Sequence, residues 1–446
     1  MDLLLTLIAS FAVLLLGVAK GIFIGYPLLL CYSFFVLLAC KRGYPLAQVM
    51  KMSFYGGKKA LLVLRIFVLI GAITASWMAS GTVPAIVYYG IQLMHPQYFI
   101  LYAFLISSFV SFLLGTCFGT ISTVGIALMV IAKGGDININ IAAGAIIAGS
   151  YFGDRCSPMS SSAHLVAHLT ETDIYKNIKN MFLTAAVPFI TAIVLYGVIS
   201  FNQPLDLTQS SLSSEIIKIF HIHWTVLVPA IVILVLALLK VDIKISMLLS
   251  IVSAAFLSVY FQGNEIRTTL HTIFFGYSIS AETSLQSIIK GGGVLSMLKP
   301  AMVVFVSCAL AGIFDGTAML SSVETLLRKK ITKHNAFSYT ALLSTASGIL
   351  GCSQTIAIVL TNQLIHKAYK EIDIDNSQQA IDLENTAVVI SPLIPWNIAA
   401  LVPSTTLMVG MTDFIPYAFY LYLIPITQFI YLKMKERKMP EIQRTQ

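Results

Sequence analysis

Charged residues are scarce in this sequence. Only 11% of the 446 residues are Asp, Glu, Lys or Arg, 57% are hydrophobic, and the mean hydropathy is +0.85. A soluble domain carries roughly 25% charged residues, so this chain cannot hide its apolar surface in a water-soluble core. The shortage of charge excludes a soluble enzyme and predicts a polytopic integral membrane protein.

The motifs of several kinds of chemistry are also missing. The sequence has no GxSxG, no Walker motif, no HExxH and no CxxC pair, so nothing supports hydrolysis, nucleotide-driven pumping or a thiol-bound metal. The six cysteines lie mostly inside apolar segments and are expected to be small buried residues. His164 and His168 have the spacing of a ligand pair but no third ligand nearby, so no metal site is predicted.

The net charge of +8 comes from basic residues in short loops beside apolar runs. They gather in residues 41–59, 328–333 and 433–438, which is the positive-inside pattern of cytoplasmic loops. No basic stripe with interleaved aromatic residues lies on a polar segment, so nucleic-acid binding is not expected. The expected location is the inner (plasma) membrane, and the expected partners are the bilayer and a small ion or organic solute, with a homodimer as a candidate assembly.

Apolar segments follow one another along most of the chain. A full span needs roughly 20 apolar residues, so with the weaker run at 82–94 we expect about 10–13 membrane elements, some of them half-helices or re-entrant hairpins. The first run begins at Leu3 without a basic region before it and is interpreted as a retained helix. The other candidate spans lie near 22–40, 61–80, 97–114, 121–133, 138–152, 181–200, 222–239, 245–261, 295–314, 336–350, 353–369, 385–410 and 414–432.

Two short breaks interrupt this apolar sequence. Residues 115–120 read GTCFGT, inside a stretch from Ile66 to Ala132 without Asp, Glu, Lys or Arg, and residues 351–355 read GCSQT. Small and hydroxylated residues here predict unwound backbone within membrane helices, which must face protein or a water-filled cavity. A seam of small residues between packed helices explains each break alone, but two breaks at matched positions favour a binding site.

The breaks belong to a pattern that occurs twice. Gly115 pairs with Gly351 and Ser157–Pro158 with Ser391–Pro392, in the same order and at nearly equal offsets. This predicts two structural repeats. The basic loop 41–59 precedes one apolar segment, whereas the basic run 328–333 follows its counterpart, so the two segments should cross in opposite directions.

Inverted repeats with interrupted helices are typical of secondary transporters, with the binding site near the midplane. The predicted fold is therefore an all-α membrane protein with two inverted-topology repeats, broken helices and re-entrant hairpins. The expected organisation is N-terminal helices (1–60), a first repeat (61–205), connecting helices with an interfacial segment (206–294), a second inverted repeat (295–432) and a cytoplasmic tail (433–446).

Asp154 is the strongest local candidate for a binding residue. It lies in GSYFGDRCSPMSSSAHL, residues 149–165, before a Ser-rich stretch that a proline breaks. An ionisable residue at membrane depth is costly and usually functional. A carboxylate together with hydroxyls such as that of Ser157 and with freed carbonyls suits a small cation. The alternative is an Asp154–Arg155 pair at the membrane surface.

The second half has a similar stretch, LENTAVVISPLIPWNIAALVPSTTL, at residues 383–407. Glu384 is its acidic residue near a Ser–Pro pair, and its three prolines rule out one regular helix. Asn385, Ser391 and Asn397 add hydroxyl and amide groups. Trp396 fits a role in the site and an interfacial anchor equally well.

Two further polar positions have open alternatives. Asp315 directly follows the apolar run 301–314 and suits either an ion or proton carrier or a helix-end residue at the interface. Gln354 puts a polar group on an otherwise apolar helix, where a hydrogen bond between helices explains it equally well.

The stretch GAIIAGSYFGDRCSPMSSSAHL resembles the NhaC-type sodium/proton antiporter family, within the larger ion transporter superfamily. The family's version reads roughly Phe-Gly-Asp-Lys, then Ser-Pro-Leu-Ser and Asp-Thr-Thr-Asn. SPLIPWN at Ser391–Asn397 is nearly the family's own motif, and GTCFGT is similar to its Gly-Thr-rich break. The resemblance covers most of the chain in order, about residues 60–430.

The resemblance implies a bundle of inverted repeats with paired re-entrant hairpins. It implies exchange of Na+ for H+, or transport of a small organic anion or amino acid coupled to such ions, with no cofactor beyond the transported ions. Carried over by position, the residues that would line the site are Thr116, Thr120, Asp154, Ser157, Glu384 and Ser391.

The chain departs from the family in places that bear on the substrate. Ser161 stands where the family has a second Asp, His164 stands where it has Asn, and Asn385 follows Glu384 where the family often has Glu-Asp. Two expected carboxylates are missing, which favours a proton-driven carrier of a neutral or zwitterionic organic solute as a rival. The alternative function is ion-coupled transport or exchange of a small organic acid or amino acid. A membrane-embedded enzyme and a passive channel are the rivals from other classes.

Overall fold

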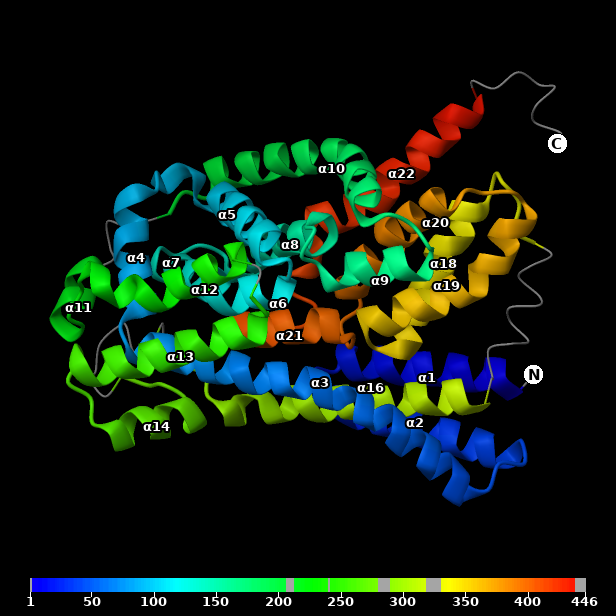
Figure 1. Cartoon of the computed structure of the whole chain (residues 1–446), viewed down its shortest axis with the longest axis horizontal. Helices are drawn as coiled ribbons and strands as arrows, with labels where there is room; N and C mark the ends of the chain where they lie inside the picture. Colours follow the sequence, from blue (N-terminus) through cyan, green and yellow to red (C-terminus); the bar gives the residue numbers. More distant parts are fainter. Residues whose placement is uncertain (1, 206–211, 240, 280–288, 318–329, 438–446) are drawn as a thin grey trace.

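The computed structural model describes residues 2–205, 212–239, 241–279, 289–317 and 330–437. These residues form helices and no strands, apart from one isolated bridge between Tyr277 and Gly291. The all-α prediction is therefore confirmed. Figure 1 shows an elongated bundle with both termini at one end and α11 (Leu212–Ile219) at the other.

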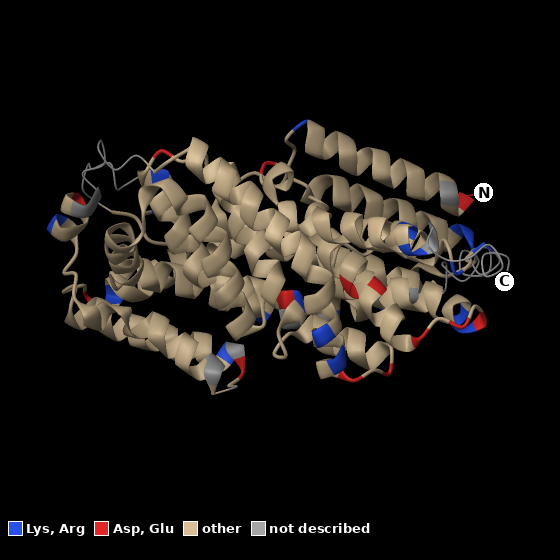
Figure 2. Ribbon diagram, turned by 90° about the horizontal axis from the view of Figure 1, so that it is seen from above, with Lys and Arg blue, Asp and Glu red and all other residues tan. Residues whose placement is uncertain are grey.

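Apolar helices of spanning length run through this bundle. Among the described residues, four have the length and composition to cross a membrane: Pro96–Leu114, Cys117–Gly134, Ile174–Asn202 and Val294–Phe314. Two bent helix pairs pass the same test together, each as a broken span or a re-entrant loop: Leu64–Ala79 with Thr82–Leu93 at 67° and Asn376–Leu393 with Ile398–Leu407 at 49°. Figure 2 shows most charged residues near the ends of the bundle and few inside it. This pattern supports a multi-pass membrane protein, and the total number of spans stays a prediction.

Two long helices form one side of the bundle, α3 (Leu46–Ala79) and α16 (Leu298–Thr317). They approach so closely at Gly56 that an added Cβ would lie 2.3 Å from the Cys308 carbonyl oxygen. The absence of a side chain at Gly56 permits this approach. Further along, the Gly293 N–H donates to the Gly71 carbonyl at 2.7 Å. Higher residue numbers on one helix meet lower numbers on the other, so the pair is antiparallel, as the charge pattern predicts for these segments.

The helices that carry the two breaks, and those that follow them, have one order in both halves of the chain. In the first half, α5 (Phe99–Leu114) leads through a break into α6 (Cys117–Thr120), a π-helical segment η2 (Ile121–Gly125) and α7 (Ile126–Gly134). In the second half, α18 (Ala336–Gly351) leads through a break into α19 (Gln354–Glu371). In Figure 1, α5 and α7 lie toward the end with α11, whereas α18 and α19 lie toward the end with the termini.

A second hairpin-like element with a break follows in each half. It is α8 (Ile139–Cys156) with α9 (Ser161–Leu169) in the first half. In the second half it is α20 (Asn376–Leu383), the π-helical segment η5 (Glu384–Val388) and α21 (Ile398–Leu407). The long helices α10 (Ile174–Asn202) and α22 (Phe419–Arg437) close the two halves. The order of elements matches, while the twofold inverted relation and the domain boundaries remain predictions.

The N-terminal and connecting helices complete the bundle. They flank these halves without contributing to the elements that carry the two breaks. Their bounds are α1 (Asp2–Ala19), α2 (Gly25–Lys41), α12 (Val228–Leu238), α13 (Ile243–Tyr260) and α14 (Ile266–Phe275), and α4 (Thr82–Leu93) follows α3 directly.

Aromatic packing fixes the helix α8 that carries Asp154. Phe152 of α8 lies between Phe189 of α10, with ring centroids 4.6 Å apart, and Tyr420 of α22, at 5.9 Å. Where α8 meets α5, a Cβ added at Gly153 would lie 2.0 Å from the Ser111 carbonyl carbon. Close backbone packing on one side and aromatic pairs on the other leave α8 little freedom to shift.

Candidate functional site

The first break is a two-residue interruption between α5 and α6. Gly115 adopts the left-handed conformation with φ +66°, and Thr116 is extended before the helix resumes at Cys117. Glycine adopts this conformation without steric cost. A Cβ at Gly115 would also lie 2.5 Å from the Met159 carbonyl carbon, so the loop after α8 packs directly on the break.

The second break repeats this backbone geometry. Cys352 is left-handed with φ +50°, Ser353 is extended, and the helix resumes at Gln354. The sequence pairing of Gly115 with Gly351 is therefore wrong by one residue, because the left-handed position is Cys352. The prediction of unwound backbone in both stretches is confirmed.

Asp154 joins the two breaks. Its Oδ1 accepts from the backbone N–H of Cys117 at 3.4 Å, and its Oδ2 accepts from the side-chain amide of Gln354 at 2.9 Å. The Ser162 hydroxyl also donates to Oδ2, at 3.1 Å. Donors from both halves of the chain thus converge on one carboxylate, which is only 8% exposed.

The end of α8 holds Asp154 in this place. The helix stops at Cys156, and the Asp154 carbonyl accepts from the hydroxyls of Ser160 and Ser162, the latter at 2.7 Å. Ser160 also caps α9 through the N–H of Ala163. Hydroxyl groups therefore satisfy the last carbonyls of one helix and the first amides of the next.

Hydrogen-bond donors and helix N-termini at Asp154 offset part of the cost of burying its negative charge. Cys117 and Gln354 are the first residues of their helical runs, and helix N-termini carry partial positive charge. Every side-chain or backbone group bonded to the carboxylate is a hydrogen-bond donor. A buried carboxylate needs such donors, and three of them reach Asp154.

Arg155 does not form an ion pair with Asp154 at the membrane surface, which was the alternative interpretation of the sequence. Its side chain is fully buried and extends away from Asp154 to α10 and η5. Nη1 donates to the Met181 carbonyl at 3.1 Å, and Nη2 donates to the Thr184 hydroxyl at 2.7 Å and to Asn385 Oδ1. Sequence analysis missed this role because all three partners are distant in sequence.

Glu384 is buried differently from Asp154. It is 1% exposed and begins the π-helical segment η5, and neither of its carboxyl oxygens has a hydrogen-bond partner. It lies close enough to Arg155 and Asp154 for the charges to interact. Segments of π-helix are frequent at functional sites, so Glu384 stays a candidate, although it makes no hydrogen bond to Asp154.

The tip of the second hairpin supports the second break. Asn397 Nδ2 donates to the Gly348 carbonyl at 3.0 Å, and Trp396 Nε1 donates to the Ile349 carbonyl at 3.0 Å. These bonds satisfy the carbonyls that the end of α18 leaves open. Trp396 is only 2% exposed, so the interfacial-anchor interpretation is wrong. Ser391 bonds within its own helix, to the Ala387 carbonyl.

The other candidates have local partners or lie outside the described side chains. Thr120 is buried and donates to the Thr116 carbonyl at 3.0 Å. The Ser157 hydroxyl accepts from the N–H of Met159 and shapes the turn after α8. Asp315 lies in α16, and its side chain is outside the described atoms.

One buried carboxylate was not predicted from the sequence. Asp382 is 2% exposed and accepts from the Tyr369 hydroxyl at 2.9 Å and from Gln378 Nε2 at 2.8 Å. The neighbouring Gln379 donates to Asn362 of α19 at 2.6 Å. The signal was present as an acidic residue two positions before Glu384, but the polar run NSQQAIDLEN looks like a loop by composition.

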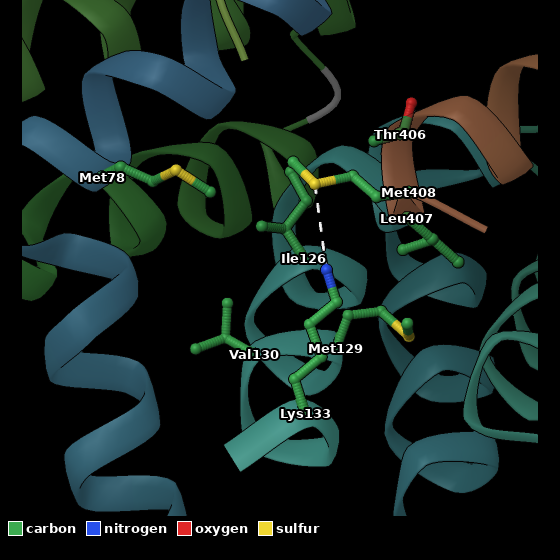
Figure 3. Close-up of a pocket in the computed structure, with 8 residues that line it drawn as sticks. All are labelled: Met78, Ile126, Met129, Val130, Lys133, Thr406, Leu407 and Met408. Atoms are coloured by element: carbon green, nitrogen blue, oxygen red, sulfur yellow. Dashed lines mark hydrogen bonds between the residues drawn. The ribbon is translucent and has the colours of Figure 1, made fainter. Parts of the chain in front are cut away.

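A small pocket lies elsewhere, between α3, α7 and α21 (Figure 3). The Lys133 ammonium donates to Met408 Sδ at 3.8 Å across it. Lys133 stands near the far end of the helical run that begins at Cys117, roughly 24 Å along the axis at 1.5 Å per residue. The pocket lining includes no carboxylate and is separate from the Asp154 site.

Comparisons with known proteins give the family. The family model described as the Na+/H+ antiporter family matches residues 149–435. The malate-2H+/Na+-lactate antiporter of Bacillus subtilis is 27% identical, over 93% of this chain and 88% of its own. The Na+/H+ antiporter NhaC of Alkalihalophilus pseudofirmus is 26% identical, over 95% of both chains.

The name of a third relative indicates a different class of solute. The arginine/ornithine antiporter ArcD of Halobacterium salinarum is 27% identical, over 81% of this chain and 76% of its own. The matched residues 149–435 include Asp154, the second break and the η5 segment. The resemblance seen in the sequence is thereby confirmed, and the chain belongs to the Na+/H+ antiporter family.

Proposed function

We propose that this chain exchanges a monovalent cation, Na+ in the first place, for protons, and that Asp154 is the carboxylate that both ions use in turn. The observation that carries the proposal is the position of Asp154, whose two carboxyl oxygens bond to the first residues after the two broken helices. A group that touches both halves can sense a movement of one against the other, as alternating access requires.

The chemistry is a competition for one carboxylate. Asp154 with a proton releases it as Na+ arrives, and the reverse step returns the proton, so charge and atoms balance in each half-cycle. The hydroxyl of Ser162 and the carbonyls at the breaks supply hard oxygens. Gln354 now donates its amide N–H to Asp154, and a turn of that amide presents its oxygen to a bound cation instead.

A small organic anion is the second candidate substrate. The observation that favours it is that all groups now bonded to Asp154 are donors, two of them at helix N-termini, where carboxylates bind well. The name of one relative, for malate and lactate, supports exchange of organic anions within the family. The name of another, for arginine and ornithine, supports exchange of amino acids instead.

Flux in proteoliposomes separates these possibilities. Purified protein with Na+, Li+ and K+ gradients should move protons against Na+, and a panel of organic acids and amino acids then tests the second candidate. Asp154→Asn should abolish the coupled flux, whereas Asp136→Asn should not. Asp136 is exposed and left-handed, a conformation that Asn tolerates, so it is a matched control. Full exchange by Asp154→Asn would remove Asp154 from the mechanism.

The remaining parts of the proposal concern location and assembly. We place the chain in the plasma membrane with the basic loops on the cytoplasmic side, because the positive-inside rule orients short loops in this way. The proposed exchange needs no cofactor beyond the transported ions. A homodimer stays a prediction that sizing in detergent can test.

A further inference from the structure

Unsatisfied polar atoms of the described core gather around Arg155. Nine buried side-chain nitrogen or oxygen atoms lack a hydrogen-bond partner, and five belong to Arg155, Glu384, Asn385 and Tyr420. Both oxygens of Glu384 are among them. Buried polar atoms normally have partners, so this concentration in one place indicates a built polar site rather than scattered packing defects.

The atoms bonded to Arg155 are the kind that bind cations. Its guanidinium donates to three oxygens, the Met181 carbonyl, the Thr184 hydroxyl and Asn385 Oδ1, and more distantly to Cys156 Sγ, at 3.6 Å. All three are neutral oxygens, and the Glu384 carboxylate lies nearby without an ion pair inside 4.0 Å. Neutral oxygens with one carboxylate are the ligand set that a hard cation prefers.

Arg155 already supplies a positive charge to this ligand set. Arginine stays protonated in proteins, and this side chain is fully buried. Its oxygen partners come from α10 and η5, while Tyr420 of α22 lies beside it. The guanidinium therefore stands at the meeting point of four elements, in the position a bound ion would take.

The neighbouring charged and titratable groups are consistent with this assignment. Asp154 and Cys156 are on α8, and Tyr420 is on α22. Asp382 is already bonded to Tyr369 and Gln378, away from this cluster. His366 of α19 bonds to Gln379, and no second described cation shares the site with Arg155.

We propose that Arg155 is a tethered cation that fills a second cation site, formed by the Met181 carbonyl, Thr184, Asn385 and Glu384. The consequence is that Glu384 and Asn385, which the sequence placed with Asp154 in one ion site, do not bind the exchanged cation. Asp154 alone then remains open to it. Only the statement that Asp154 alone binds the exchanged cation rests on the proposed cation exchange. The statement that Arg155 fills a cation site rests on the hydrogen bonds of Arg155.

Removing the side chain should expose the site. Arg155→Ala leaves the oxygens and Glu384 in place and creates room for a free ion. Purified Arg155→Ala should gain about one bound Na+ per chain relative to the native protein, measured with radioactive Na+ at equilibrium. Low concentrations of guanidinium should raise its thermal unfolding midpoint, with choline at the same concentration as the control for ionic strength.

Further variants connect the gained site to the named residues. Arg155→Ala with Glu384→Gln should lose the additional Na+, and Arg155→Lys, which keeps a tethered charge, should bind the native number. A folded Arg155→Ala protein with the native Na+ count and no response to guanidinium would overturn the proposal.

Glu384→Gln in the native background keeps the idea testable if Arg155→Ala does not fold. Its Na+ binding should be unchanged, since Arg155 already occupies the site, and loss of Na+ binding would show that Glu384 holds exchanged cation. Failure of the native protein to bind any Na+ contradicts the proposed function instead. The gain in Arg155→Ala can still be measured in that case, so the two failures are distinguishable.

Discussion

The contact between α5 and α8 at Gly153 sets how firmly Asp154 is held. A Cβ at Gly153 would lie 2.0 Å from the carbonyl carbon of Ser111 and 2.2 Å from the N of Phe112. Both are backbone atoms, so the added methyl in Gly153→Ala can fit only if the two helices move apart. Overpacking of this kind typically costs about 1–3 kcal/mol.

Gly197→Ala is a matched control for this substitution. Gly197 lies within α10, and a Cβ added there would meet no described atom within 4 Å outside its own helical turn. Alanine is favoured over glycine in a helix interior by roughly 0.8–1.0 kcal/mol. Gly197→Ala should therefore leave the thermal unfolding midpoint of the purified protein unchanged or raise it, whereas Gly153→Ala should lower it.

Gly153→Ala should also weaken exchange, because Asp154 is the next residue along α8. Unfolding midpoints come from scans in detergent, and exchange from proton flux in liposomes with equal protein content. A Gly153→Ala protein as stable and active as the native one would refute the inference that backbone packing positions Asp154.

Two other outcomes can be checked in the same preparations. Gln354→Leu removes the amide bonded to Asp154 at 2.9 Å and should weaken the apparent Na+ affinity by roughly ten- to 150-fold, given about 1.5–3 kcal/mol for hydrogen bonds to charged groups. Gln48→Leu, at an exposed position, should change nothing, and equal effects of both would argue against a role for Gln354. Cysteines introduced in place of Lys51, Lys330 and Lys435 should all react with a membrane-impermeant thiol reagent added on the cytoplasmic side. Reaction of the cysteines at positions 51 and 330 from opposite sides would remove the argument for inverted repeats.

Hydropathy predicted most of the fold because each apolar run is long enough to be a helix by itself. The breaks were also readable, since Gly115 is a residue that adopts left-handed backbone without cost. The second break was misplaced by one residue because Cys352 takes that conformation beside a glycine, Gly351, that does not. The general preference of glycine for left-handed backbone therefore pointed to the wrong one of two neighbouring residues.

The site was predictable only in part, because long-range contacts decide which polar residues meet. Asp154 and Gln354 were both candidates, but their direct bond joins residues 200 positions apart in sequence. Arg155 could not be assigned, since its partners on α10 and η5 become neighbours only in the folded bundle. Asp382 was missed because polar neighbours hid a buried residue in a sequence typical of a loop.

Proton flux driven by a Na+ gradient tests the central claim most directly. Liposomes with the native protein and with Asp154→Asn should be compared at equal protein content, with an internal pH indicator and Asp136→Asn as the control. Native and control proteins should acidify or alkalinise the lumen according to the direction of the Na+ gradient, and Asp154→Asn should show only the leak of empty liposomes. Sodium-driven proton flux of native size in Asp154→Asn would contradict the account, because the carboxylate joining the two broken helices would then carry neither ion.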